Sequence, residues 1–134
     1  VETADIDASE AWYQKVFGAK PVNRFDRERF EQRILLGDDV VVELVESKPA
    51  ATKAEDRNLG IGKAGVEVRD FDKKLVAWRA NGIATKKGGL FFDEALGLAT
   101  VLLRDPDGNI IQIFGKSAGP FDATVRVSPD HKRE

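Results

Sequence analysis

Apolar positions along the chain follow two spacings, one typical of helices and one typical of strands. The helical spacing predicts helices at residues 7–17 and 71–81, and a glycine follows each of these stretches directly. The remaining apolar stretches favour strands, and they cover residues 1–4, 20–25, 29–36, 40–46, 62–69, 83–87, 98–104 and 109–114. The predicted order is therefore strand, helix and three strands, twice over, with a polar loop at 47–60 between the halves.

The two halves are also similar in sequence, which indicates an internal duplication. When residues 1–20 are placed over residues 66–85, both carry an Asp-apolar-Asp stretch before the helix, and the matching positions include Glu2 with Glu67 and Asp5 with Asp70. In the first helix we expect Asp7 to be the N-cap, with Glu10 completing a capping box. Gly18 and Gly82 are expected to end the two helices, because a left-handed residue is needed there.

Each half ends in a predicted hairpin with an Asp-rich turn. Residues 34–46 match residues 101–115 if the second turn is two residues longer. In this alignment Glu43 and Gln112 occupy equivalent places, and each is a polar residue within a strand that is otherwise apolar.

These elements predict an α+β fold. Two βαβββ modules, at residues 1–47 and 61–116, are expected to form a curved, half-barrel mixed sheet that encloses a cavity. Residues 1–116 would then be a single domain whose first strand is truncated, followed by a C-terminal tail at 117–134 that Phe121 and Val125 order in part.

Composition removes several classes of function. The 134 residues are 42% hydrophobic and 33% charged, with a net charge of -2 and no large basic block, so nucleic acid is not an expected partner. No apolar stretch approaches the length of a membrane span and no signal peptide is visible, which favours the cytoplasm. The chain has no cysteine and a single histidine, His131, so thiolate chemistry, a core serine–histidine–aspartate triad and a site with two imidazoles are excluded for these residues.

Three stretches carry a resemblance to a known family: "DIDASEAWYQKVFGAK", "GIGKAGVEVRDFD" and "RDPDGNIIQIF". Together with the repeat they resemble the vicinal oxygen chelate superfamily, which includes glyoxalase I, extradiol dioxygenases, fosfomycin resistance enzymes and bleomycin resistance proteins. The resemblance implies the duplicated fold described above. It leaves the activity open, because one scaffold hosts many chemistries in this superfamily.

The resemblance also implies where a metal site would lie. Metal-using members bind a divalent ion with one residue from the first and one from the last strand of each half. The corresponding residues here are Glu43, Lys63 in place of the usual histidine, and Gln112 in place of the usual glutamate, while the fourth position falls upstream of Val1. An ammonium group has no lone pair for a cation, so we expect no cofactor; if a metal ion were present, Glu43 and Gln112 would be its ligands.

Without a metal ion, Lys63 and Glu43 are expected to form an ion pair that could act as a catalytic acid/base pair. Gln112 would bind substrate, and Gly65, on the same strand face as Lys63 and Glu67, leaves space for a ligand or for a neighbouring side chain. Three simpler roles stay open, in which Glu43 is a solvated rim carboxylate, Lys63 lies at a strand mouth and Gln112 is a core amide.

Phe91 and Phe92 lie in the predicted flexible loop 86–97. They could form a lid that binds an apolar substrate, a dimer contact or part of the core.

Three functions remain in view. The first is a small-molecule-binding protein without the usual metal, which could act as an isomerase or lyase through Lys63 and Glu43. The second is a drug- or metabolite-sequestering resistance protein, and the third is a metal-dependent lyase or dioxygenase whose first histidine lies upstream of Val1. The resemblance implies a small-molecule ligand and a homodimer.

Overall fold

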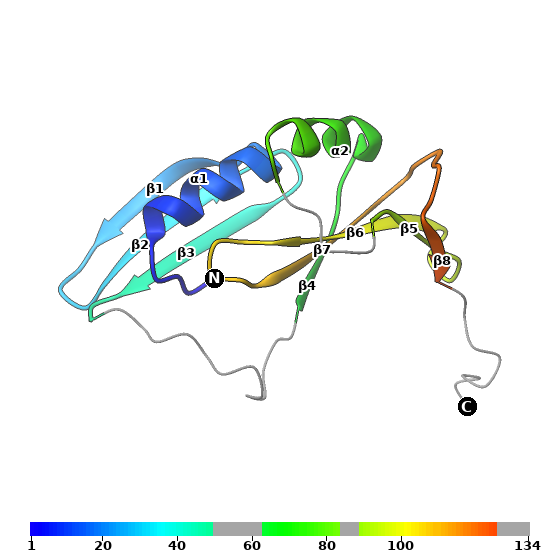
Figure 1. The fold of residues 1–134 in the computed structure, drawn as a ribbon. Helices are drawn as coiled ribbons and strands as arrows, with labels where there is room; N and C mark the ends of the chain where they lie inside the picture. The colour runs from blue at the N-terminus through cyan, green and yellow to red at the C-terminus, as the bar shows by residue number, and fades with distance from the viewer. Residues whose placement is uncertain (50–62, 84–88, 126–134) are drawn as a thin grey trace, which may run out of the picture.

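The computed structural model describes residues 1–49, 63–83 and 89–125, and only the backbone of Lys63 (Figure 1). The elements in chain order are α1 (Ile6–Phe17), β1 (Lys20–Asp26), β2 (Phe30–Leu36), β3 (Val41–Ser47), β4 (Lys63–Glu67), α2 (Phe71–Ala80), β5 (Phe91–Asp93), β6 (Leu98–Arg104), β7 (Ile110–Gly115) and β8 (Ala123–Val125). The fold class is α+β, as the sequence predicts.

The strands form two sheets that are not closed into a barrel. The first sheet has the order β1-β2-β3 and is antiparallel, and the second has the order β4-β7-β6-β5-β8. The second sheet is mixed, because β4 runs parallel to β7 and β5 runs parallel to β8. Figure 1 shows both helices on the same side of the sheets, with α1 along the first sheet.

Strand registers confirm the duplication. The N-terminal segment joins β3 through a parallel bridge between Glu2 and Val45. In the second half, Glu67 of β4 pairs in parallel with Phe114 of β7, so the first strand of each half lies beside the last strand in the same register.

The hairpin registers correct one detail of the sequence alignment. In the strand register, Ile34 lies directly opposite Glu43, and Leu102 lies directly opposite Gln112. The paired strands are joined by residues 37–40 in the first half and 105–109 in the second, so the second turn is one residue longer and not two.

The N-cap of α1 is Asp5, so the prediction of Asp7 was wrong. Asp5 is extended at φ -145° and its Oδ1 accepts from the backbone N–H of Ala8 at 2.9 Å. The cap lies two residues earlier than predicted, and the helix begins one residue earlier, at Ile6, which is buried in the core. Asp7 is therefore in the first turn of the helix. The predicted stop at Gly18 is confirmed, since this residue is left-handed at φ 63°.

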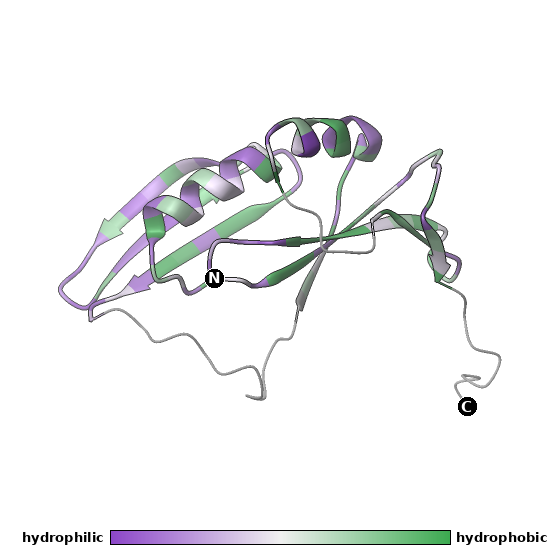
Figure 2. Cartoon of the chain, in the orientation of Figure 1, coloured by the Kyte–Doolittle hydropathy of each residue, from purple (hydrophilic) through white to green (hydrophobic). Residues whose placement is uncertain are grey.

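The core lies between the helices and the sheets. In β3, Val42 and Leu44 are buried on the helix side, whereas Val41 and Glu43 are exposed on the other side. Figure 2 shows that β3 is mostly hydrophobic and β1 mostly hydrophilic. Each sheet thus has one face covered by a helix and a second face turned away from the helices, which is called the helix-free face below.

The two modules bind each other through reciprocal contacts. Asp107, in the second hairpin turn, accepts from the backbone N–H of Ala4 at 3.0 Å. Asp39, in the first hairpin turn, accepts from the backbone N–H of Arg69 at 3.3 Å. Ala4 and Arg69 are equivalent positions in the repeat, so each module's turn binds the strand-to-helix junction of the other.

The region predicted as a flexible loop at 86–97 contains a strand, so that prediction was wrong for residues 91–93. Residues Phe91–Asp93 form β5, which pairs with β6 on one side and β8 on the other. Strand β8 comes from the predicted tail and is fixed in part by Asp122, whose Oδ2 accepts from Leu90 N at 2.7 Å. The predicted strand 83–87 falls, apart from Ile83, outside the described residues.

Candidate functional site

A polar pair lies on the helix-free face of each sheet. In the first sheet the exposed Glu43 accepts from Gln32, with 2.8 Å between Oε1 and Nε2. In the second sheet the half-buried Gln112 donates to Thr100, with 3.1 Å between Nε2 and Oγ1. Thr100 is only 4% exposed.

The two polar pairs occupy equivalent positions in the duplicated fold. Glu43 lies opposite Ile34, and its partner Gln32 is two residues earlier on β2. Gln112 lies opposite Leu102, and its partner is likewise two residues earlier on β6, at Thr100. Each hydrogen bond is therefore a diagonal contact between neighbouring strands, at the same register in both modules.

Gln112 differs from Glu43 in what it leaves available to a ligand. Its amide nitrogen is bound to Thr100, while its Oε1 accepts no hydrogen bond elsewhere in the described part of the chain. Glu43 accepts a hydrogen bond from Gln32 at its Oε1, and its side chain is exposed. The first polar pair thus offers an exposed carboxylate, and the second offers a neutral acceptor.

Strand β4 places Gly65 directly beside Gln112 in the parallel register. A Cβ at residue 65 would lie 3.2 Å from Cε2 of Phe114, so the space next to this glycine belongs to the aromatic ring of a neighbour. Lys63 pairs through its backbone with Ile110 at the start of β4. Its side chain lies outside the described residues, and its ion pair with Glu43 stays a prediction.

Phe91 and Phe92 point to opposite faces, because they are successive residues of strand β5. Phe91 pairs with Thr100 and so lies on the helix-free face with Gln112. The ring of Phe92 packs against Phe121 with 5.1 Å between centroids. Of these two residues, only Phe91 therefore shares a face with the polar pair of the second sheet.

The side chains present do not fit the metal site that the fold family implies. Across residues 1–49, 63–83 and 89–125, no group of three or more histidine, cysteine, aspartate or glutamate side chains is placed to bind a metal ion. Glu43 is the single carboxylate of the two polar pairs, and Gln112 presents an amide. A neutral amide and one carboxylate form a weak donor set for a divalent cation.

Sequence patterns missed Gln32 and Thr100. Both lie on the strand before the residue that they bind, and neither is unusual for a strand. Only the strand register brings them to Glu43 and Gln112. A second turn two residues longer would have placed Val101 opposite Gln112, whereas the structure places Leu102 there.

Outside the two polar pairs, the buried Arg33 forms a cluster of ion pairs with three carboxylates. The guanidinium of Arg33 is 5% exposed and lies 2.7–2.8 Å from carboxylate oxygens of Asp7, Glu10 and Glu31. Burial opposes its charge, but the hydrogen bonds to Glu10, Glu31 and Asp7 outweigh burial and raise the pKa of Arg33 above its ordinary value. All three carboxylates are engaged by the cation, so the cluster stabilises the packing of α1 on β2.

Comparison with known proteins agrees with the fold. Residues 1–113 match the glyoxalase/bleomycin resistance protein/dioxygenase superfamily, and the chain belongs to that superfamily. A search of curated protein sequences finds no match. No helix in the described part of the chain has the length and apolar character needed to cross a membrane.

Solved structures show the same fold at low sequence identity. A glyoxalase family protein from Enterococcus faecalis is 17% identical with a TM-score of 0.69, over 84% of this chain and 90% of that one. A glyoxalase I mutant from Zea mays is 20% identical with a TM-score of 0.68, over 90% of this chain and 45% of that one. The fosfomycin resistance protein of Listeria monocytogenes, solved with Mn(II) and sulfate, is 12% identical with a TM-score of 0.61, over 88% of each chain.

Proposed function

We propose that this chain binds a small organic molecule on the helix-free faces of its sheets, without a metal ion. The observation that carries the proposal is the pair of equivalent hydrogen bonds, Gln32–Glu43 and Thr100–Gln112. Each places a polar group within a largely apolar surface, which is the usual composition of a small-molecule site. Phe91 and the ring of Phe114 supply apolar contacts beside Gln112, and Gly65 lets that ring lie close to β4.

The test is ligand-observed NMR with a library of small organic compounds, followed by mapping of the backbone amide shifts. Binders are expected to shift the amides of Gly65, Gln112 and Phe114. Gln112→Leu should weaken these binders, whereas Glu28→Gln, at the exposed β1–β2 turn, should not. Compounds that bind but shift none of these amides would contradict the proposed site.

A second candidate function is proton transfer by Lys63 and Glu43, as in a metal-independent isomerase or lyase. The position of Lys63 favours it, because this residue lies two positions before the Gly65–Gln112 pair on β4. Lys63→Met should abolish turnover of a substrate found by the screen while leaving its binding measurable. Full turnover by a folded Lys63→Met protein would remove Lys63 from the mechanism and leave the binding role.

The metal-dependent alternative has its own readout. Elemental analysis after dialysis against Mn, Fe, Ni, Zn and Mg should find less than one ion per chain, because the donor set around Glu43 and Gln112 is weak. A stoichiometric ion that is lost in Glu43→Ala would support the metal-dependent function instead.

We also propose a homodimer. The maize glyoxalase I is matched over only 45% of its length by 90% of this chain, so one such polypeptide has room for two units of this size. Two copies of the present chain would supply the same number of modules. Sedimentation equilibrium should give twice the chain mass of 14.8 kDa, and a monomer at all concentrations would contradict the proposal.

A further inference from the structure

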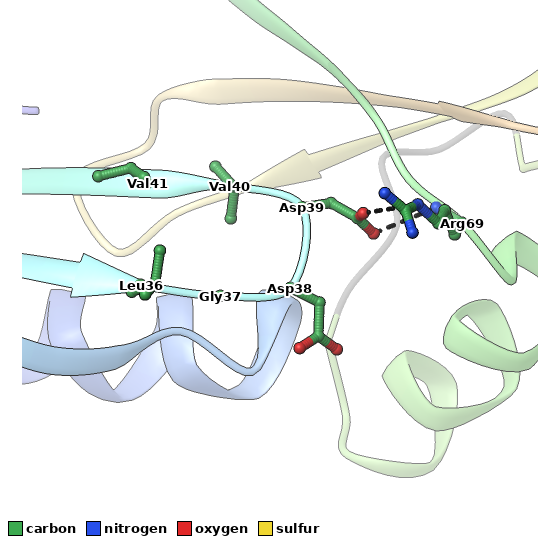
Figure 3. A pocket seen from close by; sticks show the side chains of 7 residues that line it. All are labelled: Leu36, Gly37, Asp38, Asp39, Val40, Val41 and Arg69. Atoms are coloured by element: carbon green, nitrogen blue, oxygen red, sulfur yellow. Dashed lines mark hydrogen bonds and ion pairs between the residues drawn. The ribbon is translucent and has the colours of Figure 1, made fainter.

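One corner of the first module is open, whereas an arginine side chain spans the turn at the corresponding corner of the second module. The open corner is a pocket of about 330 Å³, formed by turn residues 37–40 together with Leu36, Val41 and Arg69 (Figure 3). Leu36 and Val41 are partners across the hairpin, and they are 52% and 66% exposed. The pocket therefore has an apolar wall that is open to solvent.

At the corresponding corner of the second module, an exposed arginine spans the hairpin turn. Arg104 precedes the second hairpin turn as Leu36 precedes the first, since Arg104 pairs with Ile110 and Leu36 pairs with Val41. The guanidinium of Arg104 folds over its own turn, and Nη1 donates to the carbonyl oxygen of Gly108 at 2.7 Å. An alkyl stem with a cationic end thus occupies this position in one module.

In the first turn, the carbonyl oxygen equivalent to that of Gly108 has no donor among the described residues. Gly108 is the next-to-last residue of its turn, and Asp39 holds that place in the first turn. Within residues 1–49, 63–83 and 89–125, the carbonyl oxygen of Asp39 accepts no hydrogen bond. The residue equivalent to Arg104 is a leucine, which can supply apolar contact but no donor.

The charges around the pocket favour a cation. Asp39 is paired with Arg69, with 3.1 Å between Oδ1 and Nε, and Figure 3 shows these two side chains facing each other. Asp38 is exposed and makes no ion pair or hydrogen bond with other described residues. Two carboxylates and one guanidinium leave the pocket with one net negative charge, which a single cation would neutralise.

We propose that this pocket is a binding site for a small organic cation on an alkyl stem, such as an alkylguanidinium or alkylammonium compound. The stem lies on Leu36 and Val41, and the cationic group donates to the carbonyl oxygen of Asp39, as Arg104 does to Gly108. The site is separate from the two polar pairs and does not rest on the proposed function.

The test is titration of the full chain with n-butylguanidinium, n-butylammonium and neutral n-butylurea, observed through backbone amide shifts. Both cations are expected to shift the amides of Gly37 and Arg69 saturably, and n-butylurea is expected to bind about tenfold more weakly or not at all. Equal binding of the urea and the cations would overturn the proposal, and so would shifts confined to residues outside the pocket.

Two variants sharpen the result. Leu36→Arg gives the first turn the arginine that the second already has, so its own side chain should fill the pocket and abolish binding of both cations. Asp38→Asn should weaken binding several-fold, whereas Glu28→Gln removes the same charge at the opposite end of the sheet and should leave it unchanged. Undiminished binding by folded Leu36→Arg, or equal losses in the two charge variants, would overturn the proposal.

Discussion

Glu43 and Gln112 form the same diagonal hydrogen bond in the two modules, but with opposite polarity. Glu43 accepts from Gln32, whereas Gln112 donates to Thr100. The two bonds also differ in burial, because Glu43 is exposed and Thr100 is almost completely buried. The duplicated backbone therefore places equivalent contacts in different environments, and their energetic contributions should differ.

Replacing Gln112 with leucine should destabilise the protein by about 1 kcal/mol, because the buried hydroxyl of Thr100 loses this partner. Glu43→Leu removes the equivalent but exposed bond, and its effect should stay within about 0.5 kcal/mol. Urea unfolding measures both, and a double-mutant cycle with Thr100→Val isolates the coupling. Equal losses in the two leucine variants would show that burial does not distinguish the pairs.

Arg33→Met should be the most destabilising single change among the charged residues discussed, at roughly 2–3 kcal/mol, because the partly buried Glu10 and Glu31 lose their hydrogen bonds to the guanidinium. Arg24 is the matched control, since it lies 3.7 Å from Glu10 and 3.8 Å from Glu31 but is 57% exposed. Arg24→Met should therefore cost less than about 1 kcal/mol. Unfolding in urea at pH 7 compares them, and similar losses would argue against a special role for the buried guanidinium.

The reciprocal turn contacts should contribute unequally to the association of the modules. Asp107 accepts from both Ala4 N and Ser9 Oγ, at 3.0 and 3.2 Å. Asp39 accepts from Arg69 N at a longer 3.3 Å, and the guanidinium that it pairs with is 87% exposed. Asp107→Ala should therefore cost about 1–2 kcal/mol and Asp39→Ala less, as measured by urea unfolding.

The double variant supplies a further check on these contacts. Because the two turns share no partner, the losses in Asp107→Ala and Asp39→Ala should add to within about 0.5 kcal/mol. A markedly smaller combined loss would mean that the first substitution already separates the modules.

The sequence predicted the duplicated fold because strand spacing and hydrophobic alternation are local patterns. The equivalence of Glu43 and Gln112 followed from them and is confirmed by the registers. The cap of α1 was placed at Asp7 because a capping box needs only the sequence Asp-x-x-Glu. In the structure Asp7 and Glu10 bind Arg33 instead, a contact between a helix and a strand that no local pattern encodes.

The candidate site was harder to predict for the same reason. Gly65 could be read as open space, yet the ring that lies beside it comes from Phe114 on another strand. The apolar pair Phe91-Phe92 could be read as a lid, yet its pairing partner β8 comes from a tail of mixed polarity. The surroundings of Gly65 and of Phe91-Phe92 both depend on contacts between segments that are distant in the chain. One sequence contains no direct signal for such contacts.

Two glycines on neighbouring strands should respond differently to substitution by alanine. A Cβ at Gly115 would lie 2.5 Å from Cβ of the buried Phe71, so Gly115→Ala should cost roughly 1–3 kcal/mol through overpacking. At Gly65 the nearest atom is 3.2 Å away and belongs to the Phe114 ring, which can shift by a few tenths of an ångström. Thermal unfolding should therefore show a clear loss for Gly115→Ala and a small change for Gly65→Ala.

Tyr13 should make the protein sensitive to alkaline pH. Burial is the main cause that raises the pKa of its hydroxyl above the ordinary value of 10.0, followed by the charge of Asp105 and the 3.2 Å hydrogen bond to that residue. The unfolded chain therefore releases this proton at a lower pH than the folded chain does. Above pH 10 the unfolded state binds fewer protons, so the free energy of unfolding should fall as the pH rises.

Tyr13→Phe removes this ionisation and should lower stability by about 1 kcal/mol at pH 7, where only the hydrogen bond is lost. The deficit should shrink as the pH rises above 10, because only the wild-type protein must keep a phenol protonated. Tyr13 is the sole tyrosine, so tyrosinate absorbance reports it directly and should rise together with the loss of helical circular dichroism. Tyrosinate formation near pH 10 in a protein that is still folded would contradict the effect of burial.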